Sequence, residues 1–131
     1  SSRSTVGGGS GNSADGYRAT IGGGLNNIAD GAYATVPGGA DNDAAGDWSF
    51  ASGRRAKANN QGCFVWGDST DADVTCTNDN RTIFRSSGGF YIYTSNDLST
   101  GMYLDNTLND WQPIPAPSDR NLKQDIVAVE V

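Results

Sequence analysis

Short runs of small and β-branched residues alternate with glycine turns along the first half of the chain. Gly8, Gly23, Gly38 and Gly53 lie 15 residues apart, and the first three belong to copies of one phrase, which read TVGGG, TIGGG and TVPGG. A second phrase, NSADG, NIADG and NDAAG, recurs at the same interval. So short a fixed period is typical of one unit stacked on itself, which predicts a repeat array.

Each repeat is predicted to contain two turns and two short strands. In residues 19–21 and 34–36, small and β-branched side chains alternate, which suits a strand with one buried face. A helix is disfavoured because paired glycines would weaken it in every repeat, whereas they suit turns with positive φ. The expected turn glycines are Gly8, Gly16, Gly23, Gly31, Gly38, Gly46 and Gly53.

Stacked repeats would align equivalent residues in ladders, about 4.8 Å apart. Two such ladders are expected, Asn12–Asn27–Asn42 and Thr5–Thr20–Thr35. The candidates for the interior are all small or aliphatic: Val6, Ala14, Ala19, Ile21, Ala29, Ala34, Val36 and Ala44. Because so thin a coil buries little apolar surface by itself, we expect it to self-associate.

The repeat phrases resemble the YadA-like head repeats of trimeric autotransporter adhesins, over roughly residues 4–67. The resemblance implies a left-handed parallel β-roll in which three chains pack around a three-fold axis. The step from Gly53 to Gly67 is 14 residues, the commonest period in that family. We therefore expect an all-β homotrimer, with β-roll repeats in residues 1–67 and a β-rich trimeric segment after them.

The periodicity ends after Gly67 with a polar, acidic stretch at residues 68–80, which is predicted to be a loop. Asp68, Asp71 and Asp73 could bind calcium through their carboxylate oxygens. Their spacing is not that of an EF-hand loop, however, so a solvated turn is the favoured interpretation.

The next segment, residues 68–117, is predicted to be a β-strand connector resembling a β-prism. Strands are expected at residues 82–85, 90–94, 102–104 and 111–114, and the first two would form a hairpin. Four aromatic residues of these strands are expected to pack in a core or an interface, with a sugar-stacking platform as the alternative: Tyr91, Tyr93, Tyr103 and Trp111.

Residues 118–131 resemble the start of the intramolecular chaperone domain found in endosialidases and many phage tail fibres. The resemblance lies in SDRNLK at residues 118–123 and in the preceding GGFYIYT and GMYL segments, which look like the usual lead-in. It implies self-cleavage at Ser118 assisted by Lys123. Because only 14 residues of that domain are present, we expect cleavage only in a full-length precursor. From composition alone, Ser118 would instead cap a short helix.

Composition and charge exclude several classes of function. The 131 residues carry a net charge of −6, which disfavours nucleic-acid binding, and contain no histidine, the commonest general base and metal ligand. We expect no cofactor, no metal and no membrane span. The basic cluster of Arg54, Arg55 and Lys57 is expected at a solvated or interchain salt-bridged edge, with an anion site as the alternative. Without an initiator methionine or a signal peptide, the sequence looks like a mature product or an excised fragment.

The two cysteines, Cys63 and Cys76, are expected to form a disulfide in an exported repeat protein, with free buried thiols as the alternative. The expected function is that of a structural and adhesive segment of an extracellular homotrimeric fibre, on a bacterial cell surface or a virion tail. It would bind a host-surface receptor or glycan and would not be an enzyme. One alternative is the stalk of a glycan-cleaving tailspike, which would need paired acids, and another is ice binding along the threonine ladder. The acids nearest the aromatics are Asp97, Asp105 and Asp110.

Overall fold

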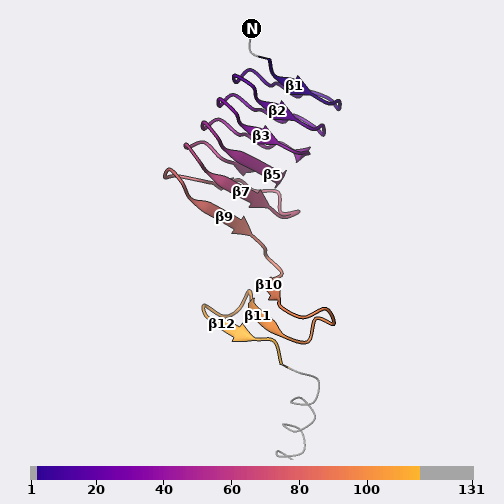
Figure 1. Ribbon diagram of the computed structural model, residues 1–131, viewed down its shortest axis with the longest axis vertical. Helices are drawn as coiled ribbons and strands as arrows, with labels where there is room; N and C mark the ends of the chain where they lie inside the picture. Colours follow the sequence, from indigo (N-terminus) through magenta and orange to yellow (C-terminus); the bar gives the residue numbers. More distant parts are fainter. Residues whose placement is uncertain (1–2, 116–131) are drawn as a thin grey trace, which may run out of the picture. The chain divides into compact units, whose positions relative to one another are not determined.

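The computed structural model describes residues 3–115, which form strands and turns without a helix. The chain divides into two compact units between Arg85 and Ser86 (Figure 1). The first, residues 3–85, is a parallel β-solenoid of about five turns, here called the roll. The second, residues 86–115, is a three-stranded sheet, here called the antiparallel unit. The all-β prediction is confirmed for this part of the chain.

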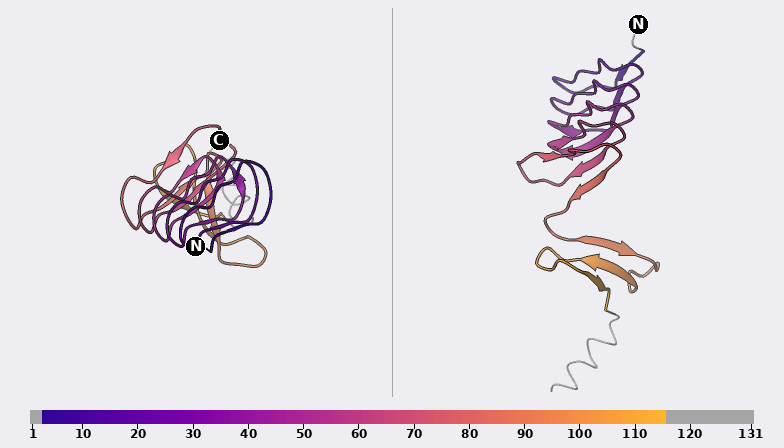
Figure 2. Two further views of the ribbon diagram at one scale, coloured as in Figure 1. Left: turned by 90° about the horizontal axis from the view of Figure 1, so that it is seen from above. Right: turned by 90° about the vertical axis from the view of Figure 1, so that its left-hand side faces the viewer.

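One strand from each coil enters the main sheet of the roll, in the order β1-β2-β3-β5-β7-β9, with β4 beside β5 and every pair parallel. The strands are β1 (Thr5–Val6), β2 (Thr20–Ile21), β3 (Thr35–Val36), β4 (Gly39–Ala40), β5 (Phe50–Arg54), β7 (Phe64–Gly67) and β9 (Thr82–Arg85). The second wall contains β6 (Ala56–Lys57), β8 (Val74–Thr75) and isolated parallel bridges in the earlier coils. Figure 2 shows the coils stacked above one another.

Buried asparagine side chains join successive coils. Asn27 Nδ2 donates to the carbonyl oxygens of Gly23 in its own coil and Gly39 in the next, each at 3.0 Å. Its Oδ1 accepts a hydrogen bond from the backbone N–H of Asn42 at 3.1 Å. Asn12 and Asn42 make equivalent bonds, so the predicted asparagine ladder is confirmed, as is the register of Thr5, Thr20 and Thr35.

The interior of the roll is a thin core of small side chains. Six of the eight predicted interior residues are fully buried: Ala19, Ile21, Ala29, Ala34, Val36 and Ala44. Ala14 is partly buried against this core. Val6 is 45% exposed because it lies in the first coil, where a neighbouring coil covers it on one side only.

Cys63 and Cys76 lie at positions that the earlier coils fill with alanine, except for Ser49 in the coil before Cys63. Cys63 precedes β7 just as Ala19 precedes β2 and Ala34 precedes β3. Cys76 follows β8 and continues the column that contains Ala29 and Ala44. The two sulfur atoms form a disulfide, 2.02 Å apart, with a Cα–Cα distance of 6.4 Å. The cystine therefore crosses the core where the earlier coils place the small side chains of alanine and serine.

Six of the seven predicted turn glycines meet one of two different requirements. Gly8, Gly23 and Gly53 have positive φ, whereas Gly16, Gly31, Gly38 and Gly46 do not. A Cβ added at Gly16, Gly31 or Gly46 would collide with a backbone carbonyl oxygen of the following coil. At these three positions glycine is required by the close approach of two backbones, and not by the turn conformation.

The parallel sheet continues past the expected boundary at residue 67. Strand β9 pairs with β7 in parallel, in the register Val65–Ile83, and belongs to the roll. The hairpin predicted between residues 82–85 and 90–94 is therefore wrong. Ile83 packs against the core of the roll, so the apolar contact with the previous coil decides the partner of this strand.

The antiparallel unit contains β10 (Phe90–Tyr93), β11 (Gly101–Leu104) and β12 (Trp111–Pro113), in that order. Strand β11 is the centre, with Tyr103 opposite both Tyr91 and Gln112. Within residues 86–115 the strands form a single sheet without a second layer, as the right-hand view of Figure 2 shows. Each strand residue therefore lies on one of the two faces of that sheet.

Removing one rung of the asparagine ladder should destabilise the whole roll. Asn27→Ala leaves the carbonyl oxygen of Gly23 and the backbone N–H of Asn42 without a partner, and it removes one of the two donors to the carbonyl oxygen of Gly39. We therefore expect a loss of about 3 kcal/mol in the free energy of unfolding. Urea unfolding followed by circular dichroism measures it. Asn59→Ala, at an exposed asparagine, is the matched control and should change stability by less than about 0.5 kcal/mol. Equal losses in the two variants would contradict the ladder's role.

Replacing the cystine should cost stability without disturbing the core. Because the equivalent positions in earlier coils hold alanine, or serine at Ser49, the double variant Cys63→Ala/Cys76→Ala fits the interior. It loses the constraint on a loop whose ends are 13 residues apart, for which we expect about 3 kcal/mol. Thermal unfolding of the oxidised, reduced and double-alanine forms measures the loss. A double-alanine form as stable as the oxidised protein would contradict the prediction.

Candidate functional site

Alternation along the strands gives the antiparallel unit two chemically different faces. One, the apolar face, is made up of Phe90, Ile92, Met102, Leu104, Trp111 and Pro113. The other, the tyrosine face, is made up of Tyr91, Tyr93, Tyr103 and Gln112. Ring contacts agree with this division, because Phe90 packs on Trp111 and Tyr91 packs on Tyr103. Of the four predicted aromatics, the structure therefore brings three together and places Trp111 on the opposite face.

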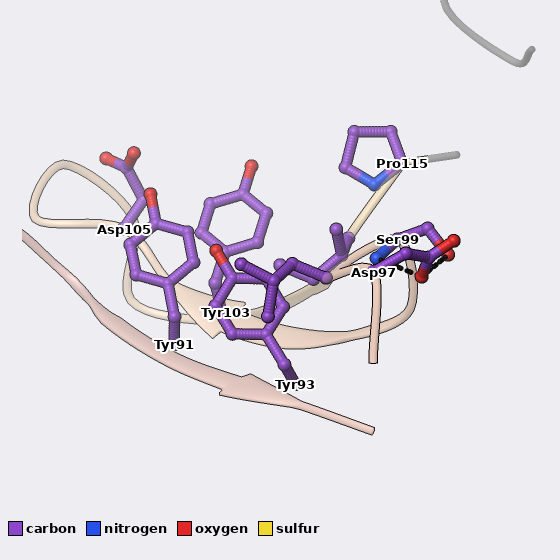
Figure 3. Close-up of a pocket in the computed structure, with 9 residues that line it drawn as sticks. Tyr91, Tyr93, Asp97, Ser99, Tyr103, Asp105 and Pro115 are labelled. Atoms are coloured by element: carbon purple, nitrogen blue, oxygen red, sulfur yellow. Dashed lines mark hydrogen bonds between the residues drawn. The ribbon is translucent and has the colours of Figure 1, made fainter. Parts of the chain in front are cut away.

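The tyrosine face carries a half-open pocket of about 350 Å³, within the usual size range of ligand sites. Its lining contains the three tyrosines, residues 97–99 of the β10–β11 loop, Asp105 after β11, and Ile114 and Pro115 after β12. All of these residues belong to the antiparallel unit. Figure 3 shows the pocket with the side chains that line it.

The three tyrosine rings stand in a stack. The centroids of Tyr91 and Tyr103 are 5.1 Å apart with an angle of 6° between the planes, and those of Tyr91 and Tyr93 are 6.1 Å apart at 12°. In Figure 3 the hydroxyl groups of all three point the same way, away from the sheet. The stack therefore presents a row of hydroxyl groups that can donate or accept hydrogen bonds.

Asp97 is held by the tight turn that leads into β11. Its Oδ1 accepts hydrogen bonds from the hydroxyl group of Ser99 at 2.7 Å and from the backbone N–H of Ser99 at 3.1 Å. Ser95 braces the same turn by accepting from the backbone N–H groups of Ser99 and Thr100. The hydrogen bond from the Ser99 side chain, followed by that from Ser95, lowers the pKa of Asp97 below its ordinary value.

Asp105 occupies the corresponding turn after β11. The hydroxyl group and the backbone N–H of Thr107 both donate to Asp105 Oδ1, the second at 2.8 Å. The Thr107 hydroxyl group is the main reason that the pKa of Asp105 lies below its ordinary value, and the backbone N–H adds to it. Both aspartates are therefore carboxylates at neutral pH, and each can accept further hydrogen bonds.

This arrangement can bind a polar ligand but is poorly suited to acid catalysis. Glycoside hydrolysis requires one carboxylic acid with a raised pKa, and both pocket aspartates have lowered values. Asp110, the third acid near the aromatics, accepts a hydrogen bond from the backbone N–H of Trp111 and does not line the pocket. The lining contains no lysine or arginine, so it would repel an anionic ligand.

The acidic loop after Gly67 pairs with arginine side chains. Asp68 Oδ1 lies 2.9 Å from Arg85 Nε, and Asp73 Oδ1 lies 2.8 Å from Arg55 Nε. Asp71 lies near both Arg54 and Arg55, at 3.1 and 3.4 Å. The three candidate calcium ligands are therefore paired with arginine side chains of the same chain, and two of these arginines, Arg54 and Arg55, belong to the basic cluster. Among the described residues, no three Asp, Glu, Cys or His side chains are gathered as metal ligands.

The structure places Lys57 of the basic cluster but does not describe the two residues expected to take part in self-cleavage. Lys57 Nζ donates to the carbonyl oxygen of Asp41 at 2.7 Å and takes no part in those ion pairs. Ser118 and Lys123 lie outside the described residues, so their expected role in self-cleavage stays a prediction.

The roll also exposes aromatic side chains on the outer face of its main sheet. The rings of Phe50 and Phe64 are stacked at 4.5 Å, and Phe84 lies 5.7 Å from Phe64. Trp66 is paired with Phe84 on the neighbouring strand and is also exposed. We call these four residues the phenylalanine patch. The repeat phrases did not predict this patch because they end before Phe64, and the aromatic residues become neighbours only through the pairing of β5, β7 and β9.

No protein-family model matches the chain, and no curated protein matches it. In the part of the chain that the structure describes, there is no helix with the length and apolarity needed to cross a membrane.

The turns that hold the pocket carboxylates can be tested separately. Ser99→Ala removes the main cause of the lowered pKa of Asp97, so that pKa should rise toward its ordinary value while the pKa of Asp105 stays unchanged. Thr107→Ala should produce the reverse. Because a lowered pKa stabilises the fold above the ordinary aspartate pKa and the effect is lost as pH falls through the lowered value, each variant should also lose stability at neutral pH relative to acid. Carboxyl-carbon NMR titration measures both values, and a shift of both aspartates in either variant would contradict the assignment.

Proposed function

We propose that this chain is a structural and adhesive segment of an extracellular homotrimeric fibre, on a bacterial surface or a phage tail. The resemblance of the repeats to YadA-like heads supports this function and supplies the left-handed, three-chain arrangement. The observation that carries the proposal is the antiparallel unit, which has an apolar face but no core of its own.

No side chain of residues 86–115 is buried. On the apolar face, Ile92, Met102 and Trp111 are 48%, 41% and 44% exposed. A sheet of three strands needs its hydrophobic face covered to be stable in water, and exposed apolar patches of this kind mark association surfaces. The unit therefore requires a partner on that face.

Other copies of the same chain are the partner that fits best. Each copy brings an identical apolar face, so association around a symmetry axis covers all of them at once. The roll presents a second apolar surface, the phenylalanine patch, on a core that is only one or two small side chains thick. Both units thus carry a surface that association between copies would cover.

The fold also supports a mechanical function. Backbone hydrogen bonds and the asparagine ladder link each coil of the roll to the next, so deformation along the stack must break many bonds together. The lowered pKa values of both pocket aspartates favour binding over hydrolysis, and so favour a fibre over a glycan-cleaving tailspike.

Light scattering coupled to size exclusion tests the assembly. We expect the mass of three chains for the wild type, and a shift toward single chains for Ile92→Glu, because a charge on the apolar face cannot be buried without a partner. Asn109→Glu adds the same charge in an exposed loop and should keep the trimer mass. A single-chain mass for the wild type, with its β-structure intact, would overturn the proposal.

A further inference from the structure

The proposed trimer contact does not account for the pocket of the tyrosine face. Its tyrosines lie on the opposite face of the sheet from the residues that we assign to the trimer contact. If the apolar face is covered by other copies, the pocket stays on the outside. A row of three tyrosines between two carboxylates lines a pocket that is large enough for a ligand.

We propose that the pocket binds a neutral or amino sugar residue of a polysaccharide, through the tyrosine row and the carboxylates of Asp97 and Asp105. This proposal rests on the proposed function, since it assigns the adhesive contact of the fibre to one site.

The two carboxylates are placed at opposite ends of the pocket. Figure 3 shows Asp105 beside Tyr91, and Asp97 at the other end of the row, beside Ser99 and Pro115. Such a separation does not suit a single metal ion, which would need both carboxylates around one point. It suits an extended ligand with hydroxyl groups at both ends.

The lining has the amphipathic character of a sugar ring. Hydroxyl groups of the tyrosines and carboxylate oxygens can bond to sugar hydroxyls, while Leu98, Ile114 and Pro115 offer apolar contact to the C–H faces. Each Asp Oδ1 is already engaged with a serine or threonine, which fixes the carboxylate in place before a ligand arrives.

Charge limits which sugars can bind. The lining carries two negative charges and no lysine or arginine to offset them, and the whole chain has a net charge of −6. Uronic and sialic acids would therefore be repelled. A sugar amine would be attracted, and a neutral hexose would be accepted.

Titration calorimetry on the wild-type protein, whose mass is measured on the same sample, tests the proposal. The probes are tetramers of glucose, mannose, glucosamine and galacturonic acid, with tetralysine as a cationic peptide. We expect at least one neutral or amino tetramer to bind, and galacturonate to bind at least about tenfold more weakly. Tyr93→Phe and Asp97→Asn, which keep the shape of the pocket, should each weaken binding by roughly fivefold to tenfold.

Matched changes on the roll serve as controls. Tyr17→Phe and Asp15→Asn alter an exposed tyrosine and an exposed aspartate outside the pocket and should leave binding unchanged. A trimer mass with no binding of any neutral or amino tetramer overturns the sugar proposal alone. So does binding that the pocket variants do not weaken, or binding of tetralysine only. A single-chain mass overturns the proposed trimer, and the pocket variants then still decide whether the sugar site exists.

Discussion

The hydrogen bonds of the buried asparagines set the geometry on which the roll depends. Each amide group links a glycine carbonyl of its own coil to a carbonyl and an N–H group of the next coil. These bonds require the coils to remain in register and at strand spacing. That spacing leaves no room for a Cβ at Gly16, Gly31 or Gly46, because the backbone of the next coil lies directly against them. The regular period in the sequence is the consequence of this one repeated contact.

A coil held so closely encloses only a thin core. Its interior is filled mainly by alanine and valine, and a cystine crosses it in place of two small side chains. A core of this kind contributes little apolar burial per residue, so much of the stability has to come from hydrogen bonds, the disulfide and association. Arg85 ends the roll by binding Asp68 and the carbonyl oxygens of Thr70 and Ala72 in the acidic loop, which ties that loop to the last coil.

The antiparallel unit faces the same difficulty more acutely, since it has no second layer. Alternation of side chains along its strands places the apolar residues on one face and the tyrosines on the other. Covering the apolar face with other copies satisfies the hydrophobic requirement, and the tyrosine face is then available for a ligand. In this view, assembly and adhesion are assigned to opposite faces of one sheet.

The sequence by itself determined the repeat, the strand character of its coils, the asparagine and threonine ladders and most of the interior, because each follows from a period that recurs in the residues. It also indicated the aromatic strands of the second unit. Only the tertiary structure decided that β9 pairs with β7 instead of β10, since strand pairing depends on which apolar surface is already formed. Likewise, the structure alone showed that Tyr33 and Trp48 are left-handed in the tight turns of their coils, at the position that Gly62 occupies later in the chain, against the local preference of bulky residues. The pocket could not be predicted either, because Asp97, Asp105 and Pro115 are brought beside the tyrosines by turns whose direction is fixed only once the sheet has formed.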